Sequence, residues 1–159
     1  MLDKKVIAWY SIDVEERKTL KEVVKMTRTK KLICSYKQGA IYLESSEKTE
    51  LAELADNGID FPEDFNLYRG IKTGNTHEIG DVVEVSDQNI ESWSEDEEVA
   101  SRFGNAVYEL ASAVKGIPVD DYITEDTDNE LEWILSSGEY KVVEVSEEDE
   151  YILYTVERI

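Results

Sequence analysis

The chain has 159 residues, of which 41% are hydrophobic and 9% aromatic, and its formal net charge is −20. This length allows one compact domain with a hydrophobic core and is too short for two ordinary ones. No apolar run approaches a membrane span, the first residues do not resemble a secretory signal, and the single cysteine has no neighbour at metal-ligand spacing. We therefore expect a cytoplasmic protein with no membrane segment and no metal site.

The first 60 residues are expected to be largely helical. Apolar residues at three- and four-residue spacing predict an amphipathic helix from Asp13 to about Met26. Residues 34–45 fit either a strand pair around Gly39 or a continued helix. Residues 45–58 predict a short helix with a serine N-cap and a stop at Asn57 and Gly58. The apolar residues of the first helix are Val14, Leu20, Val23, Val24 and Met26.

Charge is divided unevenly along the chain. Residues 1–60 hold 11 basic and 11 acidic residues, whereas residues 61–159 hold 6 basic and 26 acidic ones. Within residues 17–37, eight basic residues face only Glu22. This stripe fits a solvated helix face better than a nucleic-acid patch, because the acidic remainder would repel phosphate. Basic proteins are the expected partners, and direct nucleic-acid binding is disfavoured.

After Pro62 the sequence changes to short runs of β-branched and aromatic residues, separated by Gly, Asn, Asp or Ser. Such runs predict strands. One helix, from Glu95 to about Phe103, interrupts them, and no regular alternation of strands and helices is present. We therefore expect an α+β protein with a mixed or antiparallel β-sheet and helices packed on one side. The predicted strands are residues 65–72, 81–86, 89–93, 106–114, 132–137, 140–146 and 150–159.

The stretch "ESWS", residues 91–94, places Ser92 and Ser94 on one side of an extended chain and Trp93 on the other. Ser94 and Glu97 have the spacing of a capping box for the helix that follows, and Gly104 is a suitable stop. Ser92 precedes the helix and is not explained by capping. Its hydroxyl is therefore available to a group on a neighbouring strand.

Two further stretches contain polar residues beside apolar strands. Arg69 lies near the end of the strand in "NLYRG", where an arginine alone is commonly a salt-bridge residue. Glu130 and Glu132 flank Leu131 at the start of a strand, so alternation predicts both carboxylates on one face. In an already acidic half of the chain, the pair fits a solvated strand edge. It fits a functional site equally well, because two like charges on one face before an apolar run are costly, and paired carboxylates in a cleft often have a function.

In this order, "LYRG", "SWSEDEEVASRFG" and "ELEWIL" with the following "SSGEYKVVEV" resemble the arginine-serine-glutamate class of mono-ADP-ribosyltransferases. The resemblance covers about residues 65–145. It implies one ADP-ribosyltransferase-like domain over residues 1–159, with a helical lead-in at 1–60 and a strand-rich catalytic core at 61–159. It also implies an enzyme that transfers ADP-ribose from NAD to a protein and releases nicotinamide.

The resemblance assigns a task to each matched residue. Glu132 would be the catalytic glutamate, which binds the ribose 2′-hydroxyl and stabilises the cation that forms at the ribose. Ser92 would hold Glu132 in the NAD site. Arg69, with Gly70 beside it, would contact the diphosphate. Glu130 would orient or deprotonate the nucleophile, and a glutamate at that position goes with transfer to arginine.

The loop before the glutamates would recognise the target. Residues 120–130 hold six acidic residues and one aromatic, Tyr122, which predicts a basic target surface. Trp93 stands where the family commonly has threonine, and alternation points it into the core. His77 is expected in a solvent-exposed turn with no acid–base task.

Two alternatives stay open from the sequence. The same fold would also serve an NAD glycohydrolase, in which water replaces the protein acceptor. A compact chain with this charge would also suit an acidic, non-enzymatic binding protein that mimics nucleic acid, with carboxylates spread over its surface. A small acidic enzyme of the resembled class fits a viral or toxin effector that acts in a host cytoplasm.

Overall fold

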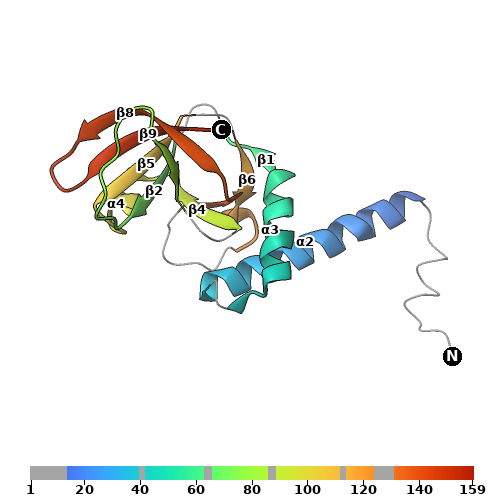
Figure 1. The fold of residues 1–159 in the computed structure, drawn as a ribbon. Coiled ribbons are helices and arrows are strands. Elements are labelled where there is room, and N and C mark those ends of the chain that lie inside the picture. The colour runs from blue at the N-terminus through green and yellow to red at the C-terminus, as the bar shows by residue number, and fades with distance from the viewer. Residues whose placement is uncertain (1–13, 40–41, 63–65, 86–88, 112–113, 124–130) are drawn as a thin grey trace.

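A computed structural model describes residues 14–39, 42–62, 66–85, 89–111, 114–123 and 131–159 (Figure 1). Three α-helices and one 3-10 turn lie within these ranges, and none of these helices has an apolar stretch long enough to cross a membrane. The helical elements are α2 (Val14–Gln38), α3 (Ser45–Asp56), α4 (Glu97–Ser101) and η2 (Val119–Asp121).

Helix α2 is longer than the sequence predicts, and its buried face lies near its C-terminal end. The predicted apolar residues Leu20, Val23, Val24 and Met26 are all exposed, because this part of α2 extends away from the sheet (Figure 1). The buried or half-buried face is instead Thr29, Leu32, Ile33 and Tyr36, which have true helical spacing. The helix continues through Gln38, so the continued-helix alternative for residues 34–38 is correct.

The predicted helix within residues 45–58 is α3, which ends before Asn57 and Gly58 as expected, but its N-cap differs from the prediction. The N-cap is Glu44, not a serine, and its backbone N–H donates to Glu47 at 3.1 Å. Arg28 ties α2 to α3 through two hydrogen bonds to the carboxylate of Glu50, at 2.9 and 3.1 Å. Part of the basic stripe therefore also joins the two helices, although the side chains of Arg28 and Glu50 stay 41% and 40% exposed.

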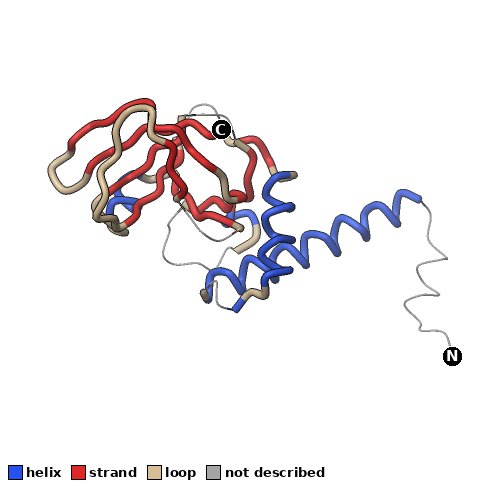
Figure 2. The backbone as a smooth tube through the Cα atoms, viewed as in Figure 1, coloured by secondary structure: helices blue, strands red, loops and turns tan. Residues whose placement is uncertain are grey.

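Nine strands form one mixed sheet in the order β1-β6-β7-β4-β2-β5-β9-β8-β3. Figure 2 shows the strands in red, gathered to one side of the long helix α2. The pair β5–β9 is parallel and every other pair is antiparallel, which confirms the expected mixed sheet. Two short strands, β1 and β6, were not predicted. The strands are β1 (Ile59–Asp60), β2 (Leu67–Ile71), β3 (Val82–Glu84), β4 (Ile90–Ser94), β5 (Ala106–Leu110), β6 (Lys115–Pro118), β7 (Glu132–Ser136), β8 (Glu139–Glu147) and β9 (Ile152–Arg158).

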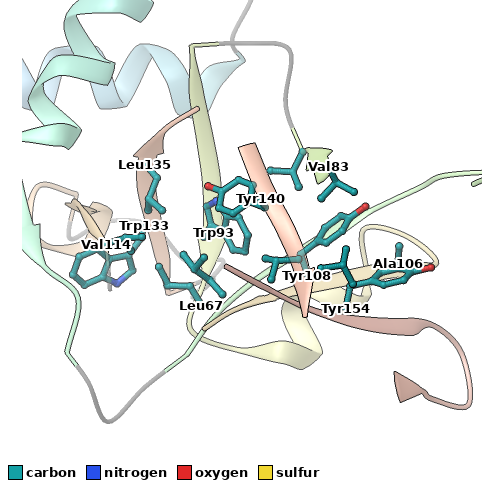
Figure 3. Packing of buried hydrophobic residues seen from close by; sticks show 14 residues of the cluster. Leu67, Val83, Trp93, Ala106, Tyr108, Val114, Trp133, Leu135, Tyr140 and Tyr154 are labelled. Carbon is teal, nitrogen blue, oxygen red and sulfur yellow. The ribbon is translucent and has the colours of Figure 1, made fainter. Parts of the chain in front are cut away.

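The sheet curls around its main core. Trp93 of β4 contacts Tyr140 of β8 with ring centroids 5.5 Å apart, although three strands separate β4 from β8 in the sheet (Figure 3). The buried residues between these strands come from the sheet and its loops, and include Tyr108, Tyr154 and Trp133. A second core lies on the outer face, where Ile90 and Ile134 of β4 and β7, and other apolar side chains, pack against α2 and α3. Strands β4 and β7 therefore separate two cores.

Candidate active site

Ser92 and Glu132 meet on the outer face of the β4–β7 pair. The register places Ser92 opposite Ile134, and Ser94 opposite Glu132. Because alternate residues share a face, Ser92, Ser94 and Glu132 lie on the helix side, and Trp93 and Trp133 point into the main core. The Ser92 hydroxyl donates to Glu132 Oε1, and Glu132 is only 9% exposed.

Helix α2 adds two residues that the sequence did not single out, Tyr36 and Lys37. Lys37 Nζ donates to Glu132 Oε2 at 2.9 Å, so each carboxylate oxygen of Glu132 accepts a hydrogen bond. Burial raises the pKa of the Tyr36 hydroxyl, against the lowering effects of a hydrogen bond with Ser92 and of the charges on Arg69 and Lys37. Tyr36 therefore lies among the polar groups of this site.

Arg69 bridges strands β2 and β4 at a point where their backbones no longer pair. Strands β2 and β4 pair at one position, Tyr68 with Ser94. Beyond it, Arg69 Nη1 donates to the carbonyl of Ser92 at 2.7 Å, and Nε donates to the carbonyl of Val85 at 3.3 Å. These two bonds fix the guanidinium and leave Nη2 without an acceptor among the described residues.

Gly70 brings helix α4 close to β2. A Cβ at this position would overlap the carbonyl of Ala100, so only glycine fits here. Val99, Ala100 and Phe103 thereby form one wall of a cavity of about 370 Å³. Polar groups from α2, β2, β4 and β7 line the same cavity, and they include Lys37, Arg69, Ser92, Ser94 and Glu132. This volume lies within the usual range for small-molecule sites.

The capping prediction for the helix after β4 was wrong. The N-cap of α4 is Asp96, whose carboxylate accepts from the backbone N–H of Glu98 at 2.9 Å. Ser94 instead accepts from the N–H of Asp96 at 3.0 Å, in the turn before the helix. Gly104 does not end the helix by a left-handed conformation, since its φ is not positive, but permits close approach to Ile71.

Strand β7 starts where the predicted strand does, but the residue before it is not extended as the comparison of Glu130 with Glu132 assumed. Leu131 has a φ of 49°, which is uncommon for a residue other than glycine, and the strand begins only at Glu132. The alternation used to place Glu130 beside Glu132 therefore does not apply, and Glu130 itself lies outside the described residues. Glu95 fixes this turn, because its N–H donates to Leu131 O and its carboxylate accepts from Trp133 Nε1.

Two residues considered from the sequence lie away from the cavity. Tyr122 is half-buried against the second core and lines a separate cavity of about 160 Å³ between the helices and β6. His77 is half-buried rather than exposed in a turn, because its ring contacts Tyr108 at 2.9 Å and Tyr154 lies against it. The cavity is built without either residue.

No protein-family model and no curated protein matches the sequence. Solved structures match it: the Vis toxin, an ADP-ribosyltransferase from Vibrio splendidus, is 17% identical over 77% of this chain, with a TM-score of 0.53. Exoenzyme S from Pseudomonas aeruginosa, in a crystal form bound to carba-NAD, is 16% identical over 71% of the chain, with a TM-score of 0.52. The catalytic domain of VahC from Aeromonas hydrophila is 13% identical over 72%, with a TM-score of 0.53.

These matches establish the fold. The chain spans 58% of the Vis toxin structure, 56% of the exoenzyme S chain and 69% of the VahC domain. The α+β architecture of ADP-ribosyltransferases, expected from the three sequence stretches, is therefore confirmed for this chain.

Proposed function

We propose that this protein is an NAD-dependent mono-ADP-ribosyltransferase, which transfers ADP-ribose to arginine on a protein and releases nicotinamide. The observation that carries this proposal is the convergence of Arg69, Ser92 and Glu132 on one cavity. Exoenzyme S, which shares the fold, binds carba-NAD in its crystal, and this supports NAD as the substrate here.

The residues that line the cavity fit the chemistry of NAD. A guanidinium held by backbone carbonyls suits the diphosphate, whose charge is permanent. A buried carboxylate suits the ribose, whose hydroxyls donate hydrogen bonds and whose anomeric carbon becomes positive during the reaction. Val99, Ala100 and Phe103 supply an apolar wall for an aromatic ring.

The reaction breaks the bond between the anomeric carbon and the ring nitrogen of nicotinamide, and the electron pair leaves with nicotinamide. Glu132 stabilises the cation that remains on the ribose. An acceptor nitrogen then forms the new bond to the anomeric carbon and loses a proton. Ser92 holds Glu132 in place during this step, because its hydroxyl donates to Oε1.

The choice of arginine as acceptor rests on the resemblance, through the glutamate at position 130. Electrostatics support a basic target, since residues 61–159 contain 26 acidic and 6 basic residues. Tyr122 stays a prediction as a target-recognition residue, and so does a cytoplasmic place of action, including a host cytoplasm for a viral or toxin effector.

The non-enzymatic alternative is less well supported. A nucleic-acid mimic needs carboxylates spread over its surface, and it gains nothing from a nearly buried glutamate held by a serine and a lysine. The position of Glu132 therefore favours chemistry. An NAD glycohydrolase would use the same groups with water as acceptor.

Labelled NAD incubated with the purified protein and a set of basic proteins tests the proposal. The wild type should label protein, Glu132→Ala should label none, and Glu130→Gln should still release nicotinamide without labelling protein. Release of nicotinamide without labelling by the wild type would favour the glycohydrolase. Consumption of no NAD by the wild type would overturn the proposal and favour the acidic binding protein.

A further inference from the structure

Among the described residues, Arg69 and Lys37 are the cations that line the cavity, and they are held in different ways. The guanidinium of Arg69 is fixed by the backbone carbonyls of Ser92 and Val85. Lys37 extends from the last turn of α2, and its ammonium forms an ion pair with Glu132. A lysine is a compact charge on a flexible stem, so it can change partners without moving the backbone.

The ion pair of Lys37 occupies the carboxylate oxygen that faces away from Ser92. Oε1 of Glu132 accepts from Ser92, and Oε2 accepts from Lys37 at 2.9 Å. The side chains of Lys37 and Glu132 are 22% and 10% exposed, so water screens this pair only in part. An ammonium at this place competes with the ribose hydroxyl and opposes a cation on the sugar. The pair must therefore open before the proposed reaction takes place.

A bound anion near Arg69 would attract the ammonium of Lys37 and so open its ion pair with Glu132. The charges of Arg69 and Lys37 both act on the hydroxyl of Tyr36, which places the two cations around one region of the cavity. NAD brings a diphosphate into that region if Arg69 binds it. The ammonium of Lys37 then exchanges the carboxylate of Glu132, with its one negative charge, for a group with two negative charges.

We propose that Lys37 is a second diphosphate-binding residue, and that NAD binding transfers its ammonium from Glu132 to the diphosphate. This inference rests on the proposed function. The catalytic carboxylate is thereby released only when a dinucleotide is bound. A nicotinamide glycoside that carries no phosphate leaves the ion pair closed and is a poor substrate, although its scissile bond is the same.

Cleavage of NAD and of nicotinamide riboside by wild type and Lys37→Met tests this inference. Methionine retains the length and apolar stem of lysine but has no charge. For NAD, the variant should have a KM raised about tenfold, because a charge-assisted hydrogen bond to the substrate is lost. For the riboside, the same variant should have a higher kcat/KM than the wild type, because Glu132 is no longer paired. This opposite response is one that simple damage to the site does not produce.

Lys31→Met is the matched control, since Lys31 lies exposed on the same helix. Lys31→Met should cleave NAD and nicotinamide riboside with the same KM and kcat/KM as the wild type. Lys37→Arg should keep the KM for NAD close to that of the wild type, because a cation is restored. Thermal unfolding of each variant checks that the fold is intact.

The outcomes separate this inference from the proposed function. If the wild type cleaves NAD and Lys37→Met lowers cleavage of both substrates, Lys37 acts only as a positioning residue for Glu132 and the inference fails. An unchanged KM for NAD in Lys37→Met overturns it as well. If the wild type cleaves neither substrate, the proposed function fails and this inference fails with it.

Discussion

The hydroxyl of Ser92 donates a hydrogen bond to Oε1 of Glu132, across 40 residues of sequence. The register of two neighbouring antiparallel strands, β4 and β7, brings these residues together. Lys37 of α2 reaches the same face. Helix α4, which packs close to β2 at Gly70, forms a wall of the cavity there. The candidate site therefore depends on strand register and on the ends of two helices.

Ser92→Ala should lower kcat for NAD cleavage by about 100-fold, because a carboxylate that is no longer oriented loses the productive geometry. The KM for NAD should change little, since Arg69 would still bind the diphosphate. Steady-state kinetics measures both. Ser146→Ala is the control, because Ser146 lies on β8 and bonds to Glu148. Equal losses in Ser92→Ala and Ser146→Ala would contradict the assigned task of Ser92.

Gly70→Ala should destabilise the protein by about 1 to 3 kcal/mol, because the new methyl group overlaps the carbonyl of Ala100 and pushes α4 away from β2. Urea unfolding measures this change. Gly74→Ala is a matched control, since a Cβ there meets no atom within 4 Å. Its effect should stay within about 0.5 kcal/mol. Equal stability of the two variants would show that α4 does not press against Gly70.

Glu91→Gln should increase stability at neutral and alkaline pH. Glu91 is fully buried beside Ser92, and its Oε1 accepts from Tyr140 at 2.5 Å and from Trp93 at 3.1 Å. Its Oε2 has no hydrogen-bond partner among the described residues. Burial raises the pKa of this carboxyl, against the lowering effect of those two hydrogen bonds. An ionised glutamate is therefore costly at this position.

The sign of the pH dependence follows from proton linkage. A carboxyl group with a raised pKa binds more protons in the folded state, so its contribution to stability falls as pH rises from the unfolded pKa to the folded one. Glutamine has no such dependence. The stability difference between Glu91→Gln and wild type should grow with pH over this window and then level off. Urea unfolding at several pH values measures it, and a difference that does not vary with pH would contradict the buried-carboxylate interpretation.

Strand content could be predicted from the sequence because it depends on local patterns, whereas the pairing of Ser92 with Glu132 was predicted from the resemblance to the arginine-serine-glutamate class. Runs rich in β-branched residues predict strands wherever they occur, and alternation alone places Ser92 and Ser94 on one face. The order of the stretches around Arg69, Ser92 and Glu132, and the family that this order resembles, then indicated the site. Each stretch alone is short and fits an ordinary structural residue equally well.

The remaining features depend on tertiary contacts that leave no local pattern. Lys37 reaches Glu132 across 95 residues, and in the sequence it is one of eight similar basic residues. The exposed apolar residues of α2 have the spacing of a buried face, but that part of the helix does not meet the sheet. The left-handed Leu131 interrupts the alternation that was used for Glu130. The matched residues Arg69, Ser92 and Glu132 lie in recognisable short stretches, whereas the contacts of α2 with the site have no such signal.

Release of nicotinamide from NAD by the purified wild type and by Glu132→Gln tests the central claim most directly. Glutamine keeps the size of the side chain and its contact with Ser92, but it lacks the negative charge that stabilises the ribose cation. We predict steady release by the wild type and loss of nearly all release by Glu132→Gln, while calorimetry still detects NAD binding to the variant. Equal release by the two proteins would contradict the assignment of Glu132 as the catalytic carboxylate. The absence of release by the wild type would contradict the enzymatic account as a whole.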